Sequence, residues 1–289
     1  MTVEDAAALI RSGKLVAFPT ETVYGLGANA LDAAAVERIF AAKRRPRTSP
    51  LIVHVDSLEM ARNLASDWPD AAETLARRYW PGPLTLVVPK QPHIPDIVTA
   101  GLPTVGLRMP AHPLALEFIR AAGVPIAAPS ANRFTELSPT AAAHVPDSLA
   151  DGILDGGPAV VGIESTVVSL VDGAVLLRPG VIPLPEIESL IGPVQVLSMT
   201  EGAHPSPGMH PRHYRPATPL YLVRPGDPLP SGRGAWLPIA NADPLQYAAG
   251  LYATLHRLDA EGWEWIAVER PPDRPEWAGI LDRLRRAAE

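Results

Sequence analysis

Short runs of apolar residues alternate with longer amphipathic segments along the first two-thirds of the chain. The apolar runs have the length of buried strands and lie at 15–18, 51–55, 84–88, 104–108 and 124–128. Apolar residues three and four positions apart predict helices at 4–11, 33–43, 58–65, 71–78 and 114–122. Further strands are expected at 153–154, 166–171 and 175–177, with Asp172-Gly173 as a hairpin turn between the last two. This alternation predicts an α/β fold.

The pattern changes after residue 197. Residues 198–219 contain five prolines, two glycines and three histidines without apolar periodicity, which is typical of a linker with extended geometry. Beyond the linker, strands are expected at 220–223, 235–239 and 265–268, and helices at 244–259 and 280–288. We therefore expect a large domain over residues 1–195, a Pro-rich linker over 196–217 and a small α/β domain over 218–289.

One stretch, residues 14–51, combines several features of a ligand-binding unit. A polar turn at 20–22 follows the first buried strand, and Gly25 and Gly27 are expected to form a flexible turn, because glycine tolerates positive φ. Asp32 is placed to cap the following helix. A cluster of four basic residues follows at the end of that helix, namely Lys43, Arg44, Arg45 and Arg47. Such a basic run is often only a solvated face, but beside hydroxyls and glycines it suggests a pocket for a small anionic ligand.

Composition limits the possible functions. The chain of 289 residues has a formal net charge of −6, which argues against nucleic-acid binding by bulk electrostatics and leaves only the cluster at 43–47 as a basic patch. Because the sequence has no cysteine, disulfides, thiolate zinc sites and a cysteine nucleophile are excluded. No apolar run approaches the ~20 residues that span a bilayer, and residues 1–10 lack the pattern of a signal peptide. We therefore expect a cytoplasmic protein that does not contact membranes.

Several familiar motifs are weak or missing. GLGANA at 25–30 matches the dinucleotide fingerprint formally, but six residues separate it from the preceding strand and no acid follows about 20 residues later. The sequence has no P-loop and no G-x-S-x-G elbow. The spacings of His204, His210 and His213 fit no helix face, so exposed loop histidines are favoured over metal ligands, and no protein metal site is expected. His54 lies in a buried strand, where a core histidine is the default interpretation.

Polar side chains also stand where strands end. Arg108 and Arg178 each end an apolar strand, and Ser130 and Asn132 follow another strand at alternate positions, which face the same side of an extended chain. Ligands of open α/β sheets gather at strand ends, and the planar arginine fork matches a carboxylate or a phosphate. A structural salt bridge is the alternative for either arginine taken alone.

Seven motifs occur in series: PTETVYGLG (19–27), KRRPRTSPL (43–51), WPGPLT (80–85), VGLRMP (105–110), PSAN (129–132), GIESTVV (162–168) and LRPG (177–180). In this order they resemble the Sua5/YrdC family of threonylcarbamoyl-AMP synthases. PGMHPRHYRP (207–216) is similar to the family's interdomain linker, and the tail beyond it is typical of the longer, two-domain Sua5 type. The resemblance implies a YrdC-like twisted mixed sheet with flanking helices around a concave pocket, followed by a small Rossmann-like α/β domain.

The resemblance also implies an activity. Family members are nucleotidyltransferases that condense L-threonine, bicarbonate or CO2, and ATP into L-threonylcarbamoyladenylate and pyrophosphate. The product feeds the t6A modification at position 37 of tRNA through partner proteins, a tRNA threonylcarbamoyl-transferase complex. Whether the chain itself binds tRNA is left open. Mg²⁺ is expected to accompany the ATP without a protein site of its own.

Roles for individual residues follow from the matched positions. The groups implied to act on the reacting phosphates are Lys43, Arg45, Ser130 and Asn132. Contacts to ATP are implied for Arg45, Ser49, Thr104, Ser130, Ser138, Arg178 and Tyr214. Contacts to L-threonine are implied for Thr22, His54, Arg108, Ala128 and Ser165, with Arg108 forking the substrate carboxylate. Tyr214 would reach from the linker to cover the nucleotide and limit the entry of water. At Ser49, many relatives carry asparagine.

Two other classes of function compete with this one. The cation cluster could instead bind double-stranded RNA, although the chain is acidic and has no aromatic platform beside the cluster. The same fold could also serve a carbamoyl transferase that acts on carbamoyl phosphate, but the zinc-finger cysteines and the acylphosphatase-like segment of such proteins are missing from this sequence.

Overall fold

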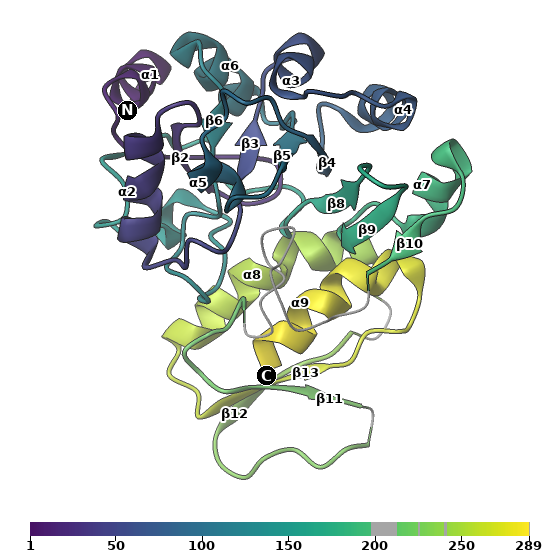
Figure 1. Cartoon of the computed structure of the whole chain (residues 1–289). Coiled ribbons are helices and arrows are strands. Elements are labelled where there is room, and N and C mark those ends of the chain that lie inside the picture. The colour runs from purple at the N-terminus through teal and green to yellow at the C-terminus, as the bar shows by residue number, and fades with distance from the viewer. Residues whose placement is uncertain (198–212, 225, 240–241, 289) are drawn as a thin grey trace.

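The computed structural model describes residues 1–197, 213–224, 226–239 and 242–288. These residues form a ten-stranded sheet with flanking helices and a separate three-stranded sheet with two long helices. Figure 1 shows the two helices of the smaller unit lying between its sheet and the larger unit. The prediction of a large and a small α/β unit is therefore confirmed.

The large sheet mixes parallel and antiparallel strands, as predicted for a YrdC-like fold. Strands β4 and β5 pair antiparallel, whereas β3 and β5 run parallel and end at the same edge. In spatial order the strands are β10 (Gln195–Val196), β9 (Val175–Arg178), β8 (Thr166–Ser169), β4 (Leu84–Pro89), β5 (Thr104–Arg108), β3 (Ile52–His54), β6 (Ile126–Ala127), β2 (Gly25–Asn29), β1 (Val16–Phe18) and β7 (Gly152–Ile153).

Five helices of the large domain occupy the segments with helical spacing, and the helices at 96–99 and 184–191 lie outside them. In chain order the helices are α1 (Val3–Arg11), α2 (Ala33–Lys43), α3 (Leu58–Leu64), α4 (Asp70–Tyr79), α5 (Asp96–Thr99), α6 (Pro113–Ala122) and α7 (Leu184–Ile191), with a 3₁₀ turn, η1, at Ala142–His144. The predicted cap of α2 is confirmed, because the Asp32 carboxylate accepts hydrogen bonds from the backbone N–H groups of Ala34 and Ala35 at 2.9 and 3.2 Å. At its other end Arg44 takes the left-handed conformation, with φ of 51°.

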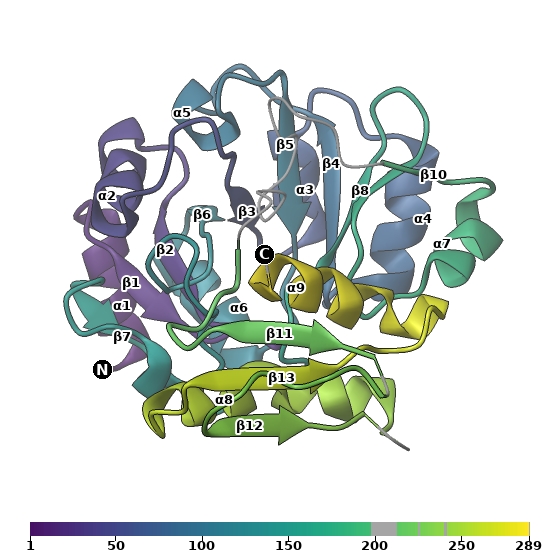
Figure 2. The same ribbon diagram turned by 90° about the horizontal axis from the view of Figure 1, so that it is seen from below.

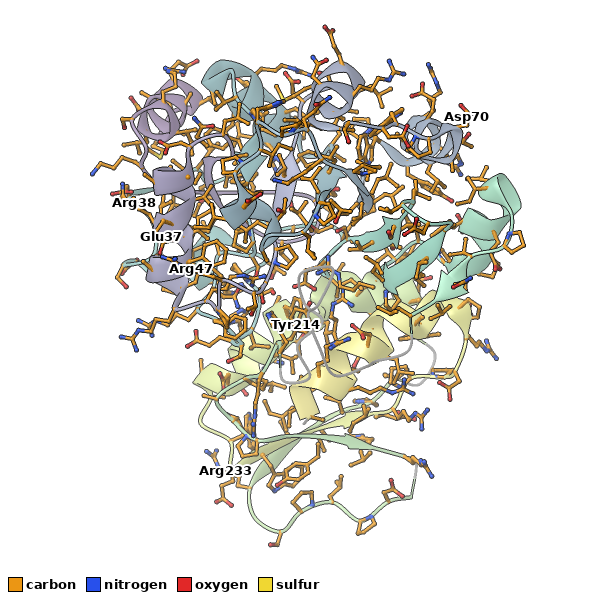
Figure 3. The ribbon with its side chains drawn as sticks, viewed as in Figure 1. Glu37, Arg38, Arg47, Asp70, Tyr214 and Arg233 are labelled. Atoms are coloured by element: carbon orange, nitrogen blue, oxygen red, sulfur yellow. The ribbon has the colours of Figure 1, made fainter. Side chains whose placement is uncertain are left out.

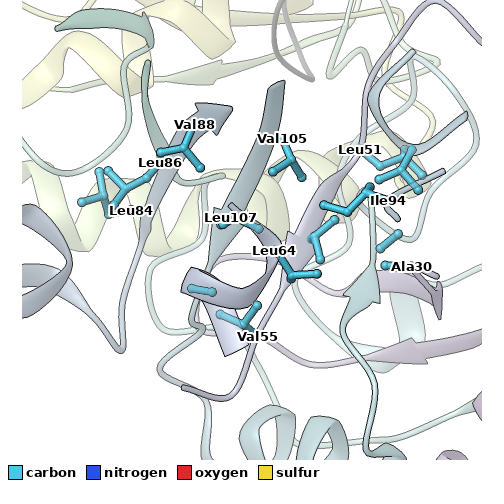
Figure 4. Close-up of a cluster of buried hydrophobic side chains, with 14 of the residues drawn as sticks. Ala30, Leu51, Val55, Leu64, Leu84, Leu86, Val88, Ile94, Val105 and Leu107 are labelled. Carbon is cyan, nitrogen blue, oxygen red and sulfur yellow. The ribbon is translucent and has the colours of Figure 1, made fainter. Parts of the chain in front are cut away.

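The core of the large domain lies between the sheet and these helices. Figure 4 shows inward side chains of neighbouring strands, among them Leu86, Val88, Val105 and Leu107, packed with Leu64 of α3. Burial of this apolar surface stabilises the sheet by about 25 cal/mol per Å² removed from water. A second cluster under α1 and α6 includes Phe18 of β1, whose ring also contacts the ring of His54 at a centroid distance of 5.7 Å.

Gly25 and Gly27 belong to strand β2, so the prediction of a flexible glycine turn is wrong. The glycines are required by packing across the sheet. A Cβ on Gly27 would lie 2.8 Å from Ile126 Cγ2 and 3.0 Å from Phe18 Cε1, and a Cβ on Gly25 would lie 3.1 Å from Phe18 Cε1. The missing Cβ atoms make room for the Phe18 ring, which packs against β2.

The small domain has two layers. Its sheet has the order β11 (Leu220–Val223), β13 (Trp265–Glu269) and β12 (Gly234–Leu237), with all strands parallel. Helices α8 (Pro244–Ala260) and α9 (Ala278–Ala288) cover one face, and a short 3₁₀ turn, η2 (Pro275–Trp277), precedes α9. Figure 2 shows α8 and α9 behind this sheet when the molecule is seen from below.

The two domains share one apolar cluster. Val23, Leu137 and Ile163 of the large domain pack with Tyr214 and with the inner faces of α8 and α9. Glycines allow main chain to approach main chain at this junction. A Cβ on Gly162 would lie 2.3 Å from the carbonyl oxygen of Ala248 in α8, and a Cβ on Gly279 in α9 would lie 2.5 Å from that of Gly180.

We keep 1–195, 196–217 and 218–289 as our proposal for the domains and their linker. Most of the proposed linker, with His204 and His210, lies outside the described residues. Its first residue, Val196, belongs to β10 and pairs with β9 of the large sheet. In the described ranges, which omit 198–212, 225, 240–241 and 289, no helix is long and apolar enough to cross a bilayer.

Candidate active site

A cavity opens where the strand ends of the large domain face the small domain. Its lining comes from distant parts of the chain: Thr20, Thr22, Val23, Gly25, Arg45, Ile52, His54, Arg108, Ala128, Pro129, Ser130, Glu164, Ser165, Arg178, His213 and Tyr214. Nine of the residues predicted from the sequence meet here, namely Thr22, Arg45, His54, Arg108, Ala128, Ser130, Ser165, Arg178 and Tyr214.

One end of the cavity combines an arginine, a histidine and hydroxyls. His54 and Arg108 are register partners on the parallel strands β3 and β5, so their side chains leave the sheet side by side. Arg108 Nη2 lies 2.7 Å from Glu21 Oε1, off the axis of a good hydrogen bond, and Arg108 Nε donates to Gly82 O at 3.3 Å. The Thr22 hydroxyl is 2.9 Å from that of Thr20. A carboxylate ligand would therefore meet a buried arginine that already has one acidic neighbour.

The His54 imidazole is neutral at physiological pH. Burial, helped by the Arg108 charge, lowers its pKa to about 3. Its Nδ1 atom is buried and has no hydrogen-bond partner among the described residues. An unpaired polar atom beside a cavity is an available contact for a ligand. His54 is therefore more than the core histidine expected by default.

The other end of the cavity holds two guanidinium groups. Arg45 Nη2 donates to Pro50 O at 3.2 Å, and its Cζ lies 5.7 Å from the centroid of the Phe134 ring. Arg178 donates from Nε and Nη2 to Ser165 O at 3.2 and 3.0 Å, and also reaches the Ser165 hydroxyl. Burial lowers the pKa of Arg45 to about 10, which still leaves it cationic at neutral pH. Two buried cations at one end suit a polyanion.

Lys43 and Asn132 lie behind the cavity wall, in contact with the loop that forms it. Lys43 Nζ donates to the carbonyl oxygens of Ser130, at 2.6 Å, and of Asn132. Burial and the nearby Arg45 charge lower the pKa of Lys43 well below its ordinary value. The Asn132 amide donates to Arg133 O and Glu136 O, both at 2.8 Å. In this conformation the ammonium group of Lys43 fixes the loop that carries Ser130.

The segment 213–215 closes the cavity from the side of the small domain. Tyr214, at 1% exposure, is seen at the junction of the domains in Figure 3. It has φ of 63° and stacks edge-on against His213 with ring centroids 4.1 Å apart. The following residue pairs with the loop 133–137, since Arg215 N–H donates to Thr135 O at 2.9 Å. His213 is 5% exposed and lines the cavity, so the prediction that it is an exposed loop histidine is wrong.

Three predicted nucleotide contacts lie outside the cavity. Ser138 is fully buried behind it and donates its hydroxyl to Glu164 Oε1 at 2.5 Å. Thr104 faces a separate hollow beneath β3 and β5, and Ser49 is half-buried in the turn after α2. The basic cluster is also divided, because Lys43 and Arg45 are buried whereas Arg44 and Arg47 are exposed, with Arg47 paired to Glu37.

Sequence reasoning missed two acidic groups, Glu164 in the cavity lining and Glu21 beside the lining residue Arg108. Glu21 lies in the polar turn and Glu164 directly precedes Ser165 in GIESTVV, so their positions beside predicted residues were the available signal. Thr20 and His213 were likewise neighbours of predicted residues. Across the residues that the structure describes, no three His, Asp or Glu side chains are grouped so that they could hold a metal ion.

Two family models match consecutive parts of the chain. Residues 8–180 match a model described as "Telomere recombination", which covers Sua5, YciO and YrdC proteins, and residues 182–289 match "Threonylcarbamoyl-AMP synthase, C-terminal domain". Proteins named threonylcarbamoyl-AMP synthase from Pyrococcus abyssi and Bacillus subtilis are 42% and 43% identical to this chain. These alignments cover 98% and 99% of the chain and 93% and 92% of the relatives.

A solved structure shows the same architecture. The crystal structure of P. abyssi Sua5 complexed with L-threonine matches with a TM-score of 0.91 and 40% sequence identity. The match covers 99% of this chain and 94% of that protein, so it includes both domains.

Proposed function

This chain belongs to the Sua5/YrdC family, and from that membership we propose that it is an L-threonylcarbamoyladenylate synthase, a nucleotidyltransferase. It condenses L-threonine, bicarbonate or CO2, and ATP, and it releases threonylcarbamoyl-AMP and pyrophosphate. The observation that supports this best is the meeting of Arg45, Arg108 and Arg178 in one cavity.

The chemistry requires positioning and charge stabilisation. The threonine nitrogen adds to the carbon of CO2 and loses a proton, which gives a carbamate. One carbamate oxygen then forms a bond to the α-phosphorus of ATP, the bond from this phosphorus to the bridging oxygen breaks, and pyrophosphate leaves. Negative charge grows on phosphate oxygens during this step, so fixed cations and N–H donors lower the barrier.

We assign the phosphate end to Arg45 and Arg178, because both guanidinium groups are buried in the cavity lining and, besides burial, the charge of Arg178 acts on Arg45 and lowers its pKa. Ser130 lies on the loop that Lys43 holds through two carbonyl groups. We therefore propose that Lys43 and Asn132 act by shaping this loop, and that Lys43 contacts phosphate only if ATP draws it away from the carbonyls.

We assign the threonine end to Thr22, His54, Arg108, Ala128 and Ser165. Arg108 would fork the substrate carboxylate, in competition with Glu21 at 2.7 Å. With a pKa of about 3, His54 is too weak a base to deprotonate the amine, so its free Nδ1 would orient the amine by a hydrogen bond.

Tyr214 and His213 would act as a cover for the nucleotide. Both side chains are buried and line the cavity, and the residue after them pairs with the loop 133–137. ATP would need space now taken by these rings, so they would move outward on entry and close over the bound substrate. Closure excludes water that would otherwise compete with the carbamate.

Mg²⁺ would be held mainly by ATP. Glu164, which lines the cavity, is engaged by Arg283, and Glu21, which lies beside the cavity residue Arg108, is engaged by that arginine. The described residues offer no cluster of three candidate ligands. Magnesium keeps several waters and commonly binds through substrate phosphates. When bound, it would neutralise part of the triphosphate charge. We further propose that the enzyme acts in the cytoplasm and that its product passes to a tRNA threonylcarbamoyl-transferase complex.

Pyrophosphate release tests this function directly. Release from ATP should require both L-threonine and bicarbonate, and mass spectrometry should identify threonylcarbamoyl-AMP. Arg45→Met should lower kcat/KM for ATP by ~10²–10³, the usual cost of a lost charge-stabilising group. The matched control is Arg47→Met, which removes an exposed arginine of the same cluster and should act like wild type. Release without threonine, or an equal effect of both variants, would refute the proposal.

A further inference from the structure

Thr85 lies behind the cavity wall and contacts one of the residues that line the cavity. It is fully buried on β4, and its Oγ1 is 2.8 Å from the Oγ of Ser165. β4 lies between β8, which begins directly after Ser165, and β5, which ends with Arg108. Thr85 itself does not line the cavity. Its hydroxyl can therefore act on a ligand there only through Ser165.

The neighbouring strand β5 holds the Thr85 side chain in one orientation. A Cβ on Gly106 would lie 3.3 Å from Thr85 Cγ2, so the methyl group of Thr85 packs over a position that has no side chain. A β-branched residue has a restricted χ1 angle, so placing the methyl group also places the hydroxyl. The hydroxyl of Thr85 is thereby directed away from Gly106 and towards Ser165.

The available donors and acceptors decide which of the two hydroxyls donates. Arg178 Nη2 can only donate, and at 3.2 Å from Ser165 Oγ it fills one lone pair of this oxygen. Among the described residues, Ser165 is the sole hydrogen-bond partner of the Thr85 hydroxyl. If Ser165 were the donor, the hydrogen of Thr85 would be buried without an acceptor, which is unfavourable. Thr85 is therefore the donor, and it fills the second lone pair of Ser165 Oγ.

With both lone pairs filled, the Ser165 hydroxyl can only donate to a ligand in the cavity. It can meet an acceptor such as a carboxylate oxygen and cannot accept from an amine. A carboxylate bound at the threonine end needs such a donor, because Arg108 already has Glu21 as an acidic neighbour at 2.7 Å. We infer that Thr85 is a positioning residue, which holds the Ser165 hydroxyl as a hydrogen-bond donor to the carboxylate of L-threonine.

This inference rests on the proposed function, since it takes L-threonine as the ligand. A change to valine tests it, because valine keeps the shape of Thr85 and removes its hydroxyl. Thr85→Val should raise the KM for L-threonine by about fivefold or more and change the KM values for ATP and bicarbonate less than that. Thr85→Ser restores the donor, so its KM for L-threonine should lie within about twofold of wild type. If Thr85→Val does not fold, Thr85→Ala removes the same hydroxyl and should show the same rise.

A double variant shows whether Thr85 acts through Ser165. Ser165→Ala removes the positioned hydroxyl itself and should raise the KM for L-threonine by about tenfold or more. Adding Thr85→Val should then have almost no further effect on this KM, because the group that Thr85 positions is already missing. If Thr85 served only to stabilise β4, the effects of the two substitutions would multiply.

Thr166→Val is the matched control. Thr166 is also fully buried and follows Ser165 directly, but its hydroxyl accepts a hydrogen bond from the backbone N–H of Ile182 at 3.2 Å and does not line the cavity. This variant should keep the wild-type KM for L-threonine even if its Tm falls. Thermal unfolding of every variant shows whether a change in KM follows a change in stability.

An inhibitor tests the carboxylate as the partner of Ser165. L-threoninol keeps the amine and the hydroxyl of threonine but has no carboxylate. Its inhibition constant against L-threonine should be the same for Thr85→Val and wild type. If inhibition by L-threoninol weakens as much as threonine binding, the donor does not meet the carboxylate and the inference is overturned.

The inference is also overturned if folded Thr85→Val keeps the wild-type KM for L-threonine, if Thr85→Ser is as weak as Thr85→Val, or if the effects of Thr85→Val and Ser165→Ala multiply. A rise in the KM for ATP or bicarbonate that equals the rise for L-threonine has the same consequence. Failure of the proposed function would look different, because wild type itself would then release no pyrophosphate. An active wild type beside an unaffected Thr85→Val would overturn this inference alone.

Discussion

Two buried tyrosines lie at the junction of the domains. Replacing one of them by phenylalanine should stabilise the protein, and replacing the other should destabilise it. Tyr214 and Tyr252 are each 1% exposed, and their ring centroids are 5.9 Å apart. The Tyr252 hydroxyl donates to Glu164, whereas the Tyr214 hydroxyl has no partner among the described residues. Replacing either by phenylalanine removes one oxygen and keeps the ring.

The magnitudes follow from what each hydroxyl does. A buried polar group without a partner costs ~1–3 kcal/mol, so Tyr214→Phe should stabilise the ligand-free protein by about 1 kcal/mol or more. A hydrogen bond to a charged group contributes ~1.5–3 kcal/mol, and at 3.2 Å the Tyr252 bond belongs near the lower end. Tyr252→Phe should therefore destabilise by about 1.5 kcal/mol. The positive φ of Tyr214 is unchanged by the substitution, so it cancels from the comparison.

Thermal unfolding without and with ATP measures both effects. One kcal/mol corresponds to ~2–4 °C in Tm for a chain of this size, so the two variants should move to opposite sides of wild type and differ by ~5 °C or more. If the Tyr214 hydroxyl bonds to the nucleotide on closure, ATP should raise the Tm of Tyr214→Phe less than that of wild type. A lower Tm for Tyr214→Phe than for wild type, without ATP, would refute the reasoning.

Three further predictions concern the loop that carries Ser130, the buried His54, and the contact of α9 with the large domain. Lys43→Met should abolish turnover and also lower Tm, because the carbonyls of Ser130 and Asn132 lose their buried donor. Lost turnover with a normal Tm would instead mean that the Lys43 ammonium group contacts phosphate directly. His54 has a folded pKa of about 3 against ~6.5 unfolded, so protonation of the unfolded state lowers stability as pH falls from 6.5 towards 3. His54→Gln should flatten that slope in urea titrations between pH 4 and 7, and an unchanged slope would count against it. Gly279→Ala should destabilise the protein, because the clash costs ~1–3 kcal/mol and the gain in helix propensity is at most ~1 kcal/mol. Gly250→Ala on α8 should stabilise the protein, because a Cβ there meets open space. Equal Tm shifts for the two variants would contradict this reasoning.

Much of the fold could be predicted because its strands and helices follow their own apolar pattern. Thr104–Arg108 and Leu220–Val223 are strands over the predicted residues, and α2 has the predicted cap. β2 could not be predicted in this way. Its glycines contribute no apolar pattern, and the strand is specified by neighbours that leave no room for a side chain.

The site could be predicted in part. Strand ends indicated Arg108 and Arg178, and the resemblance supplied residues such as Thr22 and Ser165. Within the basic cluster, helical spacing accounts for Lys43, which lies on the buried face of α2 with Ile39 and Phe40. The sequence gives no such sign for Arg45, which is buried beyond the left-handed end of the helix at Arg44.

The partnership of Glu164 with Arg283 has no local signal at all. The two residues lie 119 positions apart, and each is an ordinary charged residue in its own segment. Only the packing of α9 on the large domain brings them together. Contacts of this kind are why the role of the small domain could not be predicted from the sequence.

The glycines at the domain junction set a rule for protein engineering. At Gly162 and Gly279 the backbones of the two domains touch with no side chain between them, so neither position has room for a Cβ atom. A small domain transplanted from a relative should pack correctly on the large domain only if glycine is kept at both positions, 162 in the recipient loop and 279 in the donor helix. Chimeras that ignore this rule are expected to express as two folded halves that fail to assemble.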